Sequence, residues 1–179
     1  YKIGILGKIQ FDIEEVGSPI KFNWGKCPLA TASFGHGITT TLLQLAKAYS
    51  IIANGGYDIK PNLIKKNTGK ERKRILSDNV SEKILPILRK IVLSKEGTAS
   101  LANVEGYEIG GKTGTANKSI SGEYSNKKIN TFVSVFPISK PKFVLAVMLD
   151  EPKINESYIY EYRDGSNFKL KGSPRNTAG

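Results

Sequence analysis

The chain has 179 residues, of which 39% are hydrophobic, so it can bury one domain core or part of one. Its net charge is +11, but lysine greatly outnumbers arginine and the basic residues are spread along the chain, which indicates a solvated surface and no nucleic-acid partner. A single cysteine, Cys27, and a single histidine exclude an internal disulfide and a Cys/His zinc site, and we expect no metal and no cofactor.

The first predicted helix begins after Thr41. Thr41 and Gln44 have the spacing of a capping box, in which each side chain bonds the backbone N–H of the other residue. We expect the helix to end at Asn54-Gly55-Gly56, because glycine readily adopts the left-handed conformation that closes a helix. The apolar stripe that we expect to be buried consists of Leu42, Leu45, Ala46, Tyr49 and Ala53, widened by Leu43, Ile51 and Ile52. A short extended piece should follow at 59–64.

A second helix is predicted from a cap at Asn79, with Glu82 three residues later. Pro86 lies inside this stretch, so the helix should be kinked there or start later. Gly97 should stop the helix, and a brief helical turn is expected at 99–102. The side of the helix that we expect to be apolar carries Val80, Ile84, Leu88, Ile91 and Val92.

Three strands are predicted next, at 107–116, 131–136 and 143–149, and they should form an antiparallel meander. The third is apolar without alternation, which is typical of a strand covered on both faces, and it is far too short to span a bilayer. Beyond Pro152 the chain turns polar and aromatic. The predicted fold is α/β (α+β), an incomplete antiparallel sheet flanked by helices.

The first of these strands fits two motifs at once. Gly106-x-x-x-x-Gly111-Lys112-Thr113 matches a phosphate-binding P-loop, and Lys112-Thr113-Gly114-Thr115 matches the lysine-threonine-glycine motif of serine acyl-transferases. A P-loop must follow a buried strand and open a helix. Here residues 100–105 are a helix end and loop, and the residues after Thr113 are poor helix formers. The context therefore argues against nucleotide binding.

An exposed edge strand suits the acyl-transferase interpretation. Its glycines let another backbone approach closely, so that a substrate peptide can add as a further strand. Lys112 supplies a fixed positive charge, Thr113 and Thr115 supply hydroxyls beside the groove, and the Thr115 amide can donate to a developing oxyanion.

Several further segments occur in a recognisable order around this strand. The ordered segments are Ala32-Ser33-Phe34-Gly35-His36-Gly37, Thr41-Leu42-Leu43-Gln44-Leu45-Ala46-Lys47-Ala48-Tyr49, Ala53-Asn54-Gly55-Gly56, Glu96-Gly97-Thr98-Ala99, Gly106 to Ala116, Phe132-Val133-Ser134-Val135-Phe136-Pro137 and Asp150-Glu151-Pro152. With these segments the chain resembles, over roughly residues 1 to 152, the C-terminal half of the transpeptidase domain of a class B penicillin-binding protein, and the first two segments resemble the division-specific (septal) branch.

This resemblance implies a penicillin-binding transpeptidase or serine β-lactamase-like fold and a serine D,D-transpeptidase that cross-links peptidoglycan. Its implied partners are stem peptides ending in D-Ala-D-Ala, β-lactam antibiotics, and divisome membrane proteins that bind regions outside this chain. Its implied location is the periplasmic face of the inner membrane, with an N-terminal anchor absent from this chain. Because the chain opens on Tyr1, we expect residues 1–179 to be a partial transpeptidase domain, with 153–179 a divergent polar tail within it.

The resemblance also implies roles for four residues. Lys112 would serve the proton network and the field that attracts the substrate carboxylate. Thr113 and Thr115 would contact that carboxylate, and the Thr115 amide would form half of the oxyanion hole. Gly114 would leave room for the substrate to approach.

The nucleophile of such enzymes lies in a serine-x-x-lysine motif, followed by serine-x-asparagine. Ser18-Pro19-Ile20-Lys21 and Ser77-Asp78-Asn79 imitate these motifs, but the first contains a proline and the second is typical of a helix cap. We therefore expect the nucleophile to lie outside this chain and the isolated chain to be inactive. The alternatives are an inactive penicillin-binding or sensor domain of the same fold, a serine β-lactamase, and the P-loop nucleotide binder.

Overall fold

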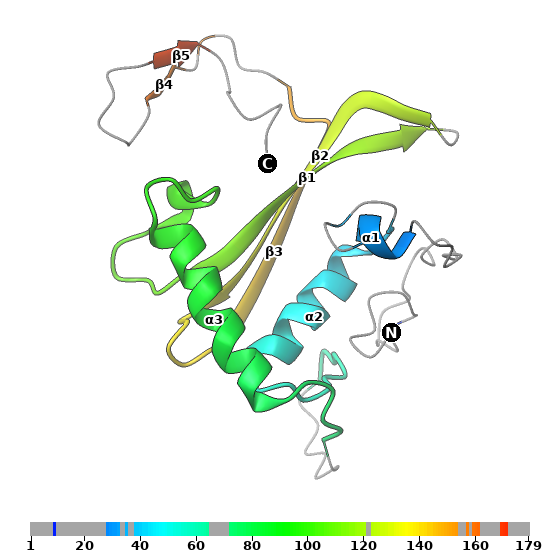
Figure 1. Cartoon of the computed structure of the whole chain (residues 1–179), viewed down its shortest axis with the longest axis vertical. Coiled ribbons are helices and arrows are strands. Elements are labelled where there is room, and N and C mark those ends of the chain that lie inside the picture. Colours follow the sequence, from blue (N-terminus) through cyan, green and yellow to red (C-terminus); the bar gives the residue numbers. More distant parts are fainter. Residues whose placement is uncertain are drawn as a thin grey trace. The chain divides into compact units, whose positions relative to one another are not determined.

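The computed structural model describes residues 9, 28–32, 35, 38–64, 72–120, 123–153, 157, 159–161 and 169–171. The chain divides into two compact units, residues 1–81 and 82–179, which are described separately (Figure 1). The expectations placed on Ser18, Cys27 and the basic loop at 65–70 lie outside the described residues. Within the described part, no helix combines the length and apolar character that a membrane span requires.

The first unit contains helix α1, Pro28–Ala32, and helix α2, Leu42–Ala53. The predicted capping box of α2 is confirmed. The Thr41 backbone N–H donates to Gln44 Oε1 at 2.8 Å, and the Gln44 backbone N–H donates to Thr41 Oγ1 at 3.2 Å. These two bonds satisfy N–H groups that the first turn of a helix leaves without partners.

The most buried side of α2 differs from the predicted stripe. Its buried residues are Gln44, Ala48 and Ile51. Ile51 is buried as predicted, whereas the other residues of the predicted stripe are only half-buried, and Gln44 and Ala48 were not part of it. Gln44 is fully buried because its amide oxygen is already bonded by the capping box, which removes most of the cost of burying a polar side chain.

Helix α2 ends at Asn54 as predicted, and Gly55 and Gly56 follow with φ of 81° and 91°. At Gly56 a Cβ atom would lie 2.2 Å from the Leu76 carbonyl oxygen, so only glycine fits. No strand forms at 59–64. Tyr57 instead makes one isolated bridge with Arg74, whose guanidinium lies over the Tyr57 ring at 4.2 Å.

Helix α3, Asp78–Leu93, begins earlier than predicted. Asp78 lies in its first turn and is paired with Arg74. The Ser77-Asp78-Asn79 segment therefore lies at the N-terminus of the helix as predicted, but Asn79 is already inside the helix and is not its cap. Pro86 neither ends the helix nor delays its start. Because Pro86 is exposed, the carbonyl group that it leaves unbonded can face water. Leu88 and Val92 are buried as predicted, but Val80 is 36% exposed.

The second unit contains the predicted antiparallel meander. Its three strands are β1, Gly110–Ile120, β2, Glu123–Phe136, and β3, Phe143–Asp150, in the order β1-β2-β3. Figure 1 shows β1 and β2 continuing as a hairpin past the end of β3. The short helix η1, Ser100–Ala102, matches the predicted turn. Strands β4, Ile159–Glu161, and β5, Lys169–Lys171, pair separately.

Helix α3 contacts the start of β1. Arg89 Nη1 donates to the Ile109 carbonyl oxygen at 2.7 Å, and a Cβ atom at Gly110 would lie 3.1 Å from the Arg89 backbone nitrogen and 2.6 Å from Ile138 Cδ1. Among the described residues of this unit, the buried apolar ones are Leu88, Val92, Ala99, Val133 and Val135. Burial of these side chains supplies the hydrophobic stabilisation that holds β1 in place.

Strand β3 is not covered as its apolar sequence predicts. Phe143, Leu145, Val147 and Leu149 are between 42% and 58% exposed. An exposed apolar edge strand is a surface that pairs readily with other chains.

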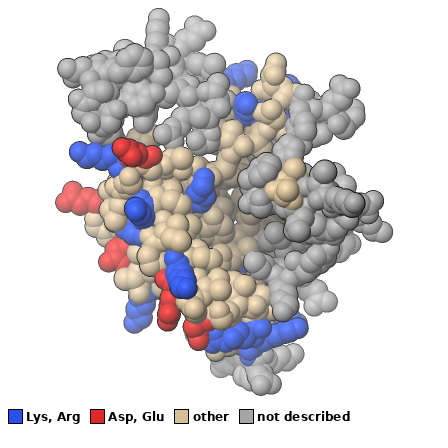
Figure 2. Space-filling view, viewed as in Figure 1, with Lys and Arg blue, Asp and Glu red and all other residues tan. Residues whose placement is uncertain are grey.

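Charged side chains of both signs occur next to one another on the face of the molecule that is drawn in Figure 2.

Candidate functional site

The Lys112-to-Thr115 segment lies in the middle of β1, at the edge of the sheet. Lys112 pairs with Val133 and Thr115 pairs with Asn130, both on β2. Among the described residues, no strand pairs with the other side of β1. The predicted edge position is therefore confirmed, but the strand runs from Gly110 to Ile120 and not over 107–116. A P-loop is excluded, because Lys112 and Thr113 lie within a strand and not at the N-terminus of a helix.

Two glycines allow β2 to approach β1 closely. A Cβ atom at Gly111 would lie 2.7 Å from the Val133 carbonyl oxygen, and one at Gly114 would lie 2.7 Å from Thr131 Oγ1. The Thr131 hydroxyl donates to the Gly114 carbonyl oxygen at 3.4 Å. Glycine at 114 thus leaves room for the Thr131 hydroxyl of the neighbouring strand, in addition to the room for substrate that the resemblance implies.

The hydroxyl of Thr113 reaches outside the sheet. It donates to Thr98 Oγ1 at 3.1 Å, and Thr98 lies in the turn that follows α3. This turn is closely packed, because a Cβ atom at Gly97 would lie 2.0 Å from the Ile91 carbonyl oxygen, and Ala99 is 4% exposed. No role for Thr98 could be predicted from the sequence. The only signal was its place in the Glu96-Gly97-Thr98-Ala99 segment.

Lys112 is exposed, and its ammonium group donates to the Thr113 carbonyl oxygen at 2.7 Å. The positive charge is therefore held beside the edge strand. The Thr115 side chain is half-buried. The structure brings together all four predicted residues and adds Thr98, so that hydroxyl groups and one ammonium group lie along one strand edge. Such an arrangement suits an extended peptide that carries a negative charge.

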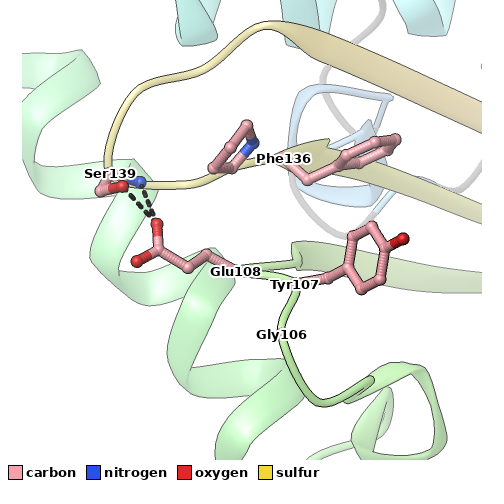
Figure 3. Close-up of a pocket in the computed structure, with 6 residues that line it drawn as sticks. Gly106, Tyr107, Glu108, Phe136 and Ser139 are labelled. Atoms are coloured by element: carbon pink, nitrogen blue, oxygen red, sulfur yellow. Dashed lines mark hydrogen bonds between the residues drawn. The ribbon is translucent and has the colours of Figure 1, made fainter.

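A pocket lies near the start of β1. It has a volume of about 340 Å³ and is lined by Gly106, Tyr107, Glu108, Phe136, Pro137 and Ser139. Figure 3 shows the Glu108 carboxylate turned toward Ser139. Glu108 accepts bonds from the Ser139 hydroxyl and from the Ser139 backbone N–H, the latter at 3.2 Å, and these bonds lower the pKa of its carboxyl group. None of the four predicted site residues lines this pocket. The hydrogen bonds between Glu108 and Ser139 instead connect the segment before β1 to the β2–β3 turn.

At the other end of β1, Lys118 forms an ion cluster. Its ammonium group contacts the Asp150 carboxylate at 2.8 and 2.9 Å and Glu151 Oε1 at 2.9 Å. These bonds raise the pKa of Lys118, and the same contact with Lys118 is the main cause of a lowered pKa at Glu151. In the sequence, Asp150-Glu151-Pro152 is only one of the segments that carry the resemblance.

The chain is similar to a known family of proteins. Residues 1–167 match the family described as the penicillin binding protein transpeptidase domain. The chain therefore belongs to this family, which confirms the resemblance.

One curated relative is a peptidoglycan D,D-transpeptidase FtsI from Buchnera aphidicola subsp. Baizongia pistaciae. It is 38% identical over 143 residues, which cover 77% of this chain and 25% of the relative. The chain spans about a third or less of the length of the curated relatives it matches.

Solved structures confirm the fold class. The transpeptidase domain of penicillin-binding protein 3 from Burkholderia pseudomallei matches with a TM-score of 0.77 and 32% identity, over 84% of this chain and 47% of that one. Penicillin-binding protein 3 from Mycobacterium tuberculosis, in complex with aztreonam, matches with a TM-score of 0.77 and 26% identity, over 84% of this chain and 38% of that one. The sheet seen here is thus part of a penicillin-binding transpeptidase fold.

Proposed function

We propose that this chain supplies the substrate-binding edge of a serine D,D-transpeptidase that cross-links peptidoglycan stem peptides. We call the longer enzyme that contains it the parent enzyme. The observation that carries the proposal is the position of Lys112, Thr113 and Thr115 on an edge strand whose outer side pairs with no described strand. Membership of the transpeptidase family and the named relatives support it.

The edge strand suits a donor peptide that ends in D-Ala-D-Ala. The peptide adds alongside β1 through main-chain hydrogen bonds, and its terminal carboxylate takes hydrogen bonds from Thr113 and Thr115 near the positive charge of Lys112. The Thr115 amide donates to the oxygen of the carbonyl group under attack, where negative charge develops. Thr98 keeps the Thr113 hydroxyl at the edge through its 3.1 Å contact. When the carboxylate binds, Thr113 turns its single hydrogen toward the carboxylate and accepts a hydrogen bond from the Thr98 hydroxyl in exchange.

The reaction needs a serine from the remainder of the parent enzyme. Its oxygen attacks the carbonyl carbon between the two D-alanines, the C–N bond breaks, and the leaving D-alanine takes up a proton. The acyl group then passes to the amine of a neighbouring stem peptide, and the serine regains its proton. Lys112 assists these proton transfers by holding positive charge beside the site. A β-lactam presents the same carboxylate and carbonyl and leaves the serine acylated.

The wider assignment follows from the same proposal. We place the parent enzyme in the division-specific branch, at the periplasmic face of the inner membrane, with divisome membrane proteins as partners of its other regions. The FtsI relative supports this branch. Depletion of the parent enzyme in its source cells would then block septation and leave elongation intact, whereas loss of cell width control would contradict the branch.

Labelling with a fluorescent penicillin tests the proposed function. The parent enzyme should be acylated at one serine outside this chain, and the isolated 179-residue chain should not be labelled. In the parent enzyme, Thr115→Val should reduce the acylation rate about tenfold through loss of its hydrogen bonds, whereas Thr39→Ala, on an exposed residue before α2, should leave it unchanged. Stoichiometric labelling of any serine in this chain would contradict the proposal.

A second assay separates an enzyme from an inactive binding domain of the same fold. The parent enzyme should release D-alanine from a synthetic peptide ending in D-Ala-D-Ala and transfer the acyl group to an added amine. Acylation by penicillin without any release of D-alanine would identify a sensor domain instead.

A further inference from the structure

We propose that Lys118, bound by Asp150 and Glu151, is a positioning residue that fixes the substrate-binding segment of β1. The inference rests on the proposed function, because it concerns the geometry of Thr113 and Thr115. Lys118 touches no substrate in this proposal. It acts by joining the far end of β1 to the end of β3, across the strand that lies between them.

The pairing of β1 with β2 breaks just beyond the site. Asn117 pairs with Lys128, but Ser119 pairs with Tyr124, so the register shifts at Lys118. The last residue of β3, Asp150, pairs with Ile129. Beyond this point the β1–β2 hairpin has only two strands (Figure 1). Two-stranded hairpins are marginally stable in water, so this end of β1 needs another anchor if Thr115 is to stay in place.

The contacts of Lys118 provide that anchor. Its ammonium group bonds both oxygens of Asp150 and one oxygen of Glu151, at 2.8 to 2.9 Å. Lys127 contacts the second oxygen of Glu151 at 2.9 Å. The Ser125 hydroxyl donates to the Lys118 carbonyl oxygen at 3.0 Å, which closes the hairpin behind the register shift. Two ammonium groups thus meet two carboxylates at the base of the hairpin.

The backbone at Glu151 supports a specific role for this cluster. Glu151 has a φ of 51°, a left-handed conformation that side-chain-bearing residues rarely adopt. In that conformation its N–H donates to the Lys128 carbonyl oxygen at 2.9 Å, while its carboxylate reaches Lys118 and Lys127. A strained residue that persists this way is held by its contacts, here the contacts that reach Lys118.

The ion cluster around Lys118 fixes the position of β1 more than it stabilises the folded domain. The Lys118 side chain is 29% exposed and those of Asp150 and Glu151 are 50% and 37% exposed, and ion pairs at such exposed sites add little to the free energy of folding. A small displacement of a binding group can nevertheless slow a reaction strongly. Loss of Lys118 should therefore lower the acylation rate without unfolding the domain.

The test uses the parent enzyme with Lys118→Met, which keeps the length of the side chain and removes its charge, and Lys118→Arg, which restores the charge. Lys142→Met is the matched control on an exposed lysine of the β2–β3 turn. Acylation by a fluorescent penicillin is measured as a binding constant, a first-order acylation rate and the number of acylated sites. Lys118→Met should lower the second-order rate constant about tenfold. Its melting temperature should fall by no more than about 2 °C.

Lys118→Arg should recover most of the rate, and amide hydrogen exchange at 113–118 should be faster in Lys118→Met than in the wild type. Three results would overturn the role of Lys118. The Lys118→Met enzyme could keep the wild-type rate, its loss of rate could be explained by fewer acylatable sites, or Lys118→Arg could fail to recover the rate. If the wild-type parent enzyme is not acylated at all, the proposed function fails, and this inference fails with it.

Discussion

Thr113 on β1 donates its hydroxyl hydrogen to Thr98 in the turn after α3, with 3.1 Å between the two oxygens. The bond joins two segments that are 15 residues apart in the sequence. It orients a hydroxyl that we propose for substrate binding, and it does so from a turn that can contain only glycine at position 97. The turn and the strand therefore form one structural unit.

Removing the Thr98 hydroxyl should weaken this orientation. In the parent enzyme, Thr98→Val preserves the shape of the side chain and should slow penicillin acylation about fivefold, since one hydrogen bond is worth about 1 kcal/mol. Thr98→Ser should retain the wild-type rate. Stopped-flow acylation with both variants measures the effect, and equal rates for valine and serine would show that the contact has no role.

Gly97→Ala should destabilise the parent enzyme, because the added Cβ atom would lie 2.0 Å from the Ile91 carbonyl oxygen. We expect a loss of about 2 kcal/mol or more in the free energy of unfolding. Gly106→Ala is the matched comparison, since Gly106 has a φ of 80° and open space around it. Its cost should be about 1 kcal/mol, from backbone strain alone. Denaturant unfolding measures both, and a smaller loss for Gly97→Ala would contradict the packing described here.

The capping box makes a separate prediction for α2. Thr41→Ala removes the acceptor of the Gln44 N–H, and it should lower the free energy of unfolding by about 1 kcal/mol. Thr41→Ser should restore it. The neighbouring exposed residue supplies the control Thr39→Ala, which should be neutral. Chemical denaturation of the four proteins compares them, and a neutral Thr41→Ala would mean that the cap does not stabilise the helix.

Glu108 predicts a dependence of stability on pH. The bonds from Ser139 lower its pKa below 4.5, its ordinary value, so the folded state favours the charged carboxylate. The stabilisation is present above the unfolded-state pKa and is lost as the pH falls through the lower, folded-state pKa. Glu108→Gln should therefore flatten the fall in melting temperature between about pH 5 and pH 3. Glu105→Gln, at an exposed carboxylate nearby, should leave that fall intact, and the same slope in both variants would refute the assignment.

The exposed side chains of β3 predict self-association of the isolated chain. Leu145 is 49% exposed and Val147 is 42% exposed on a strand whose outer edge pairs with no described strand. Replacing both with lysine should reduce light scattering at a given concentration, because charges on an edge strand oppose pairing between chains. Leu101→Lys, at a residue that is 53% exposed on η1, is the control. Equal scattering from both variants would show that β3 is not the associating surface.

Much of the local structure could be predicted from the sequence. The capping box of α2, the closing glycines at 55 and 56 and the meander of three strands depend on residues close together in the chain, and all are confirmed. For α3, the segment that begins the helix was predicted, but its first residue and the effect of Pro86 on its start were wrong. That effect depends on whether the carbonyl group that Pro86 leaves unbonded faces water. On α2, the burial of Ile51 was predicted but that of Gln44 was not, since burying its amide requires the capping bond that satisfies it.

The motif, its place on a strand and the family of the chain can all be read from the amino-acid sequence, because ordered segments and turn residues are properties of the chain. The contacts of Thr98 with Thr113, and of Lys118 with Asp150 and Glu151, are visible only in the folded protein. These partners are 15, 32 and 33 residues apart. Hydrogen bonds and ion pairs at such separations have no periodic signature, since they form only after packing has brought the two segments together.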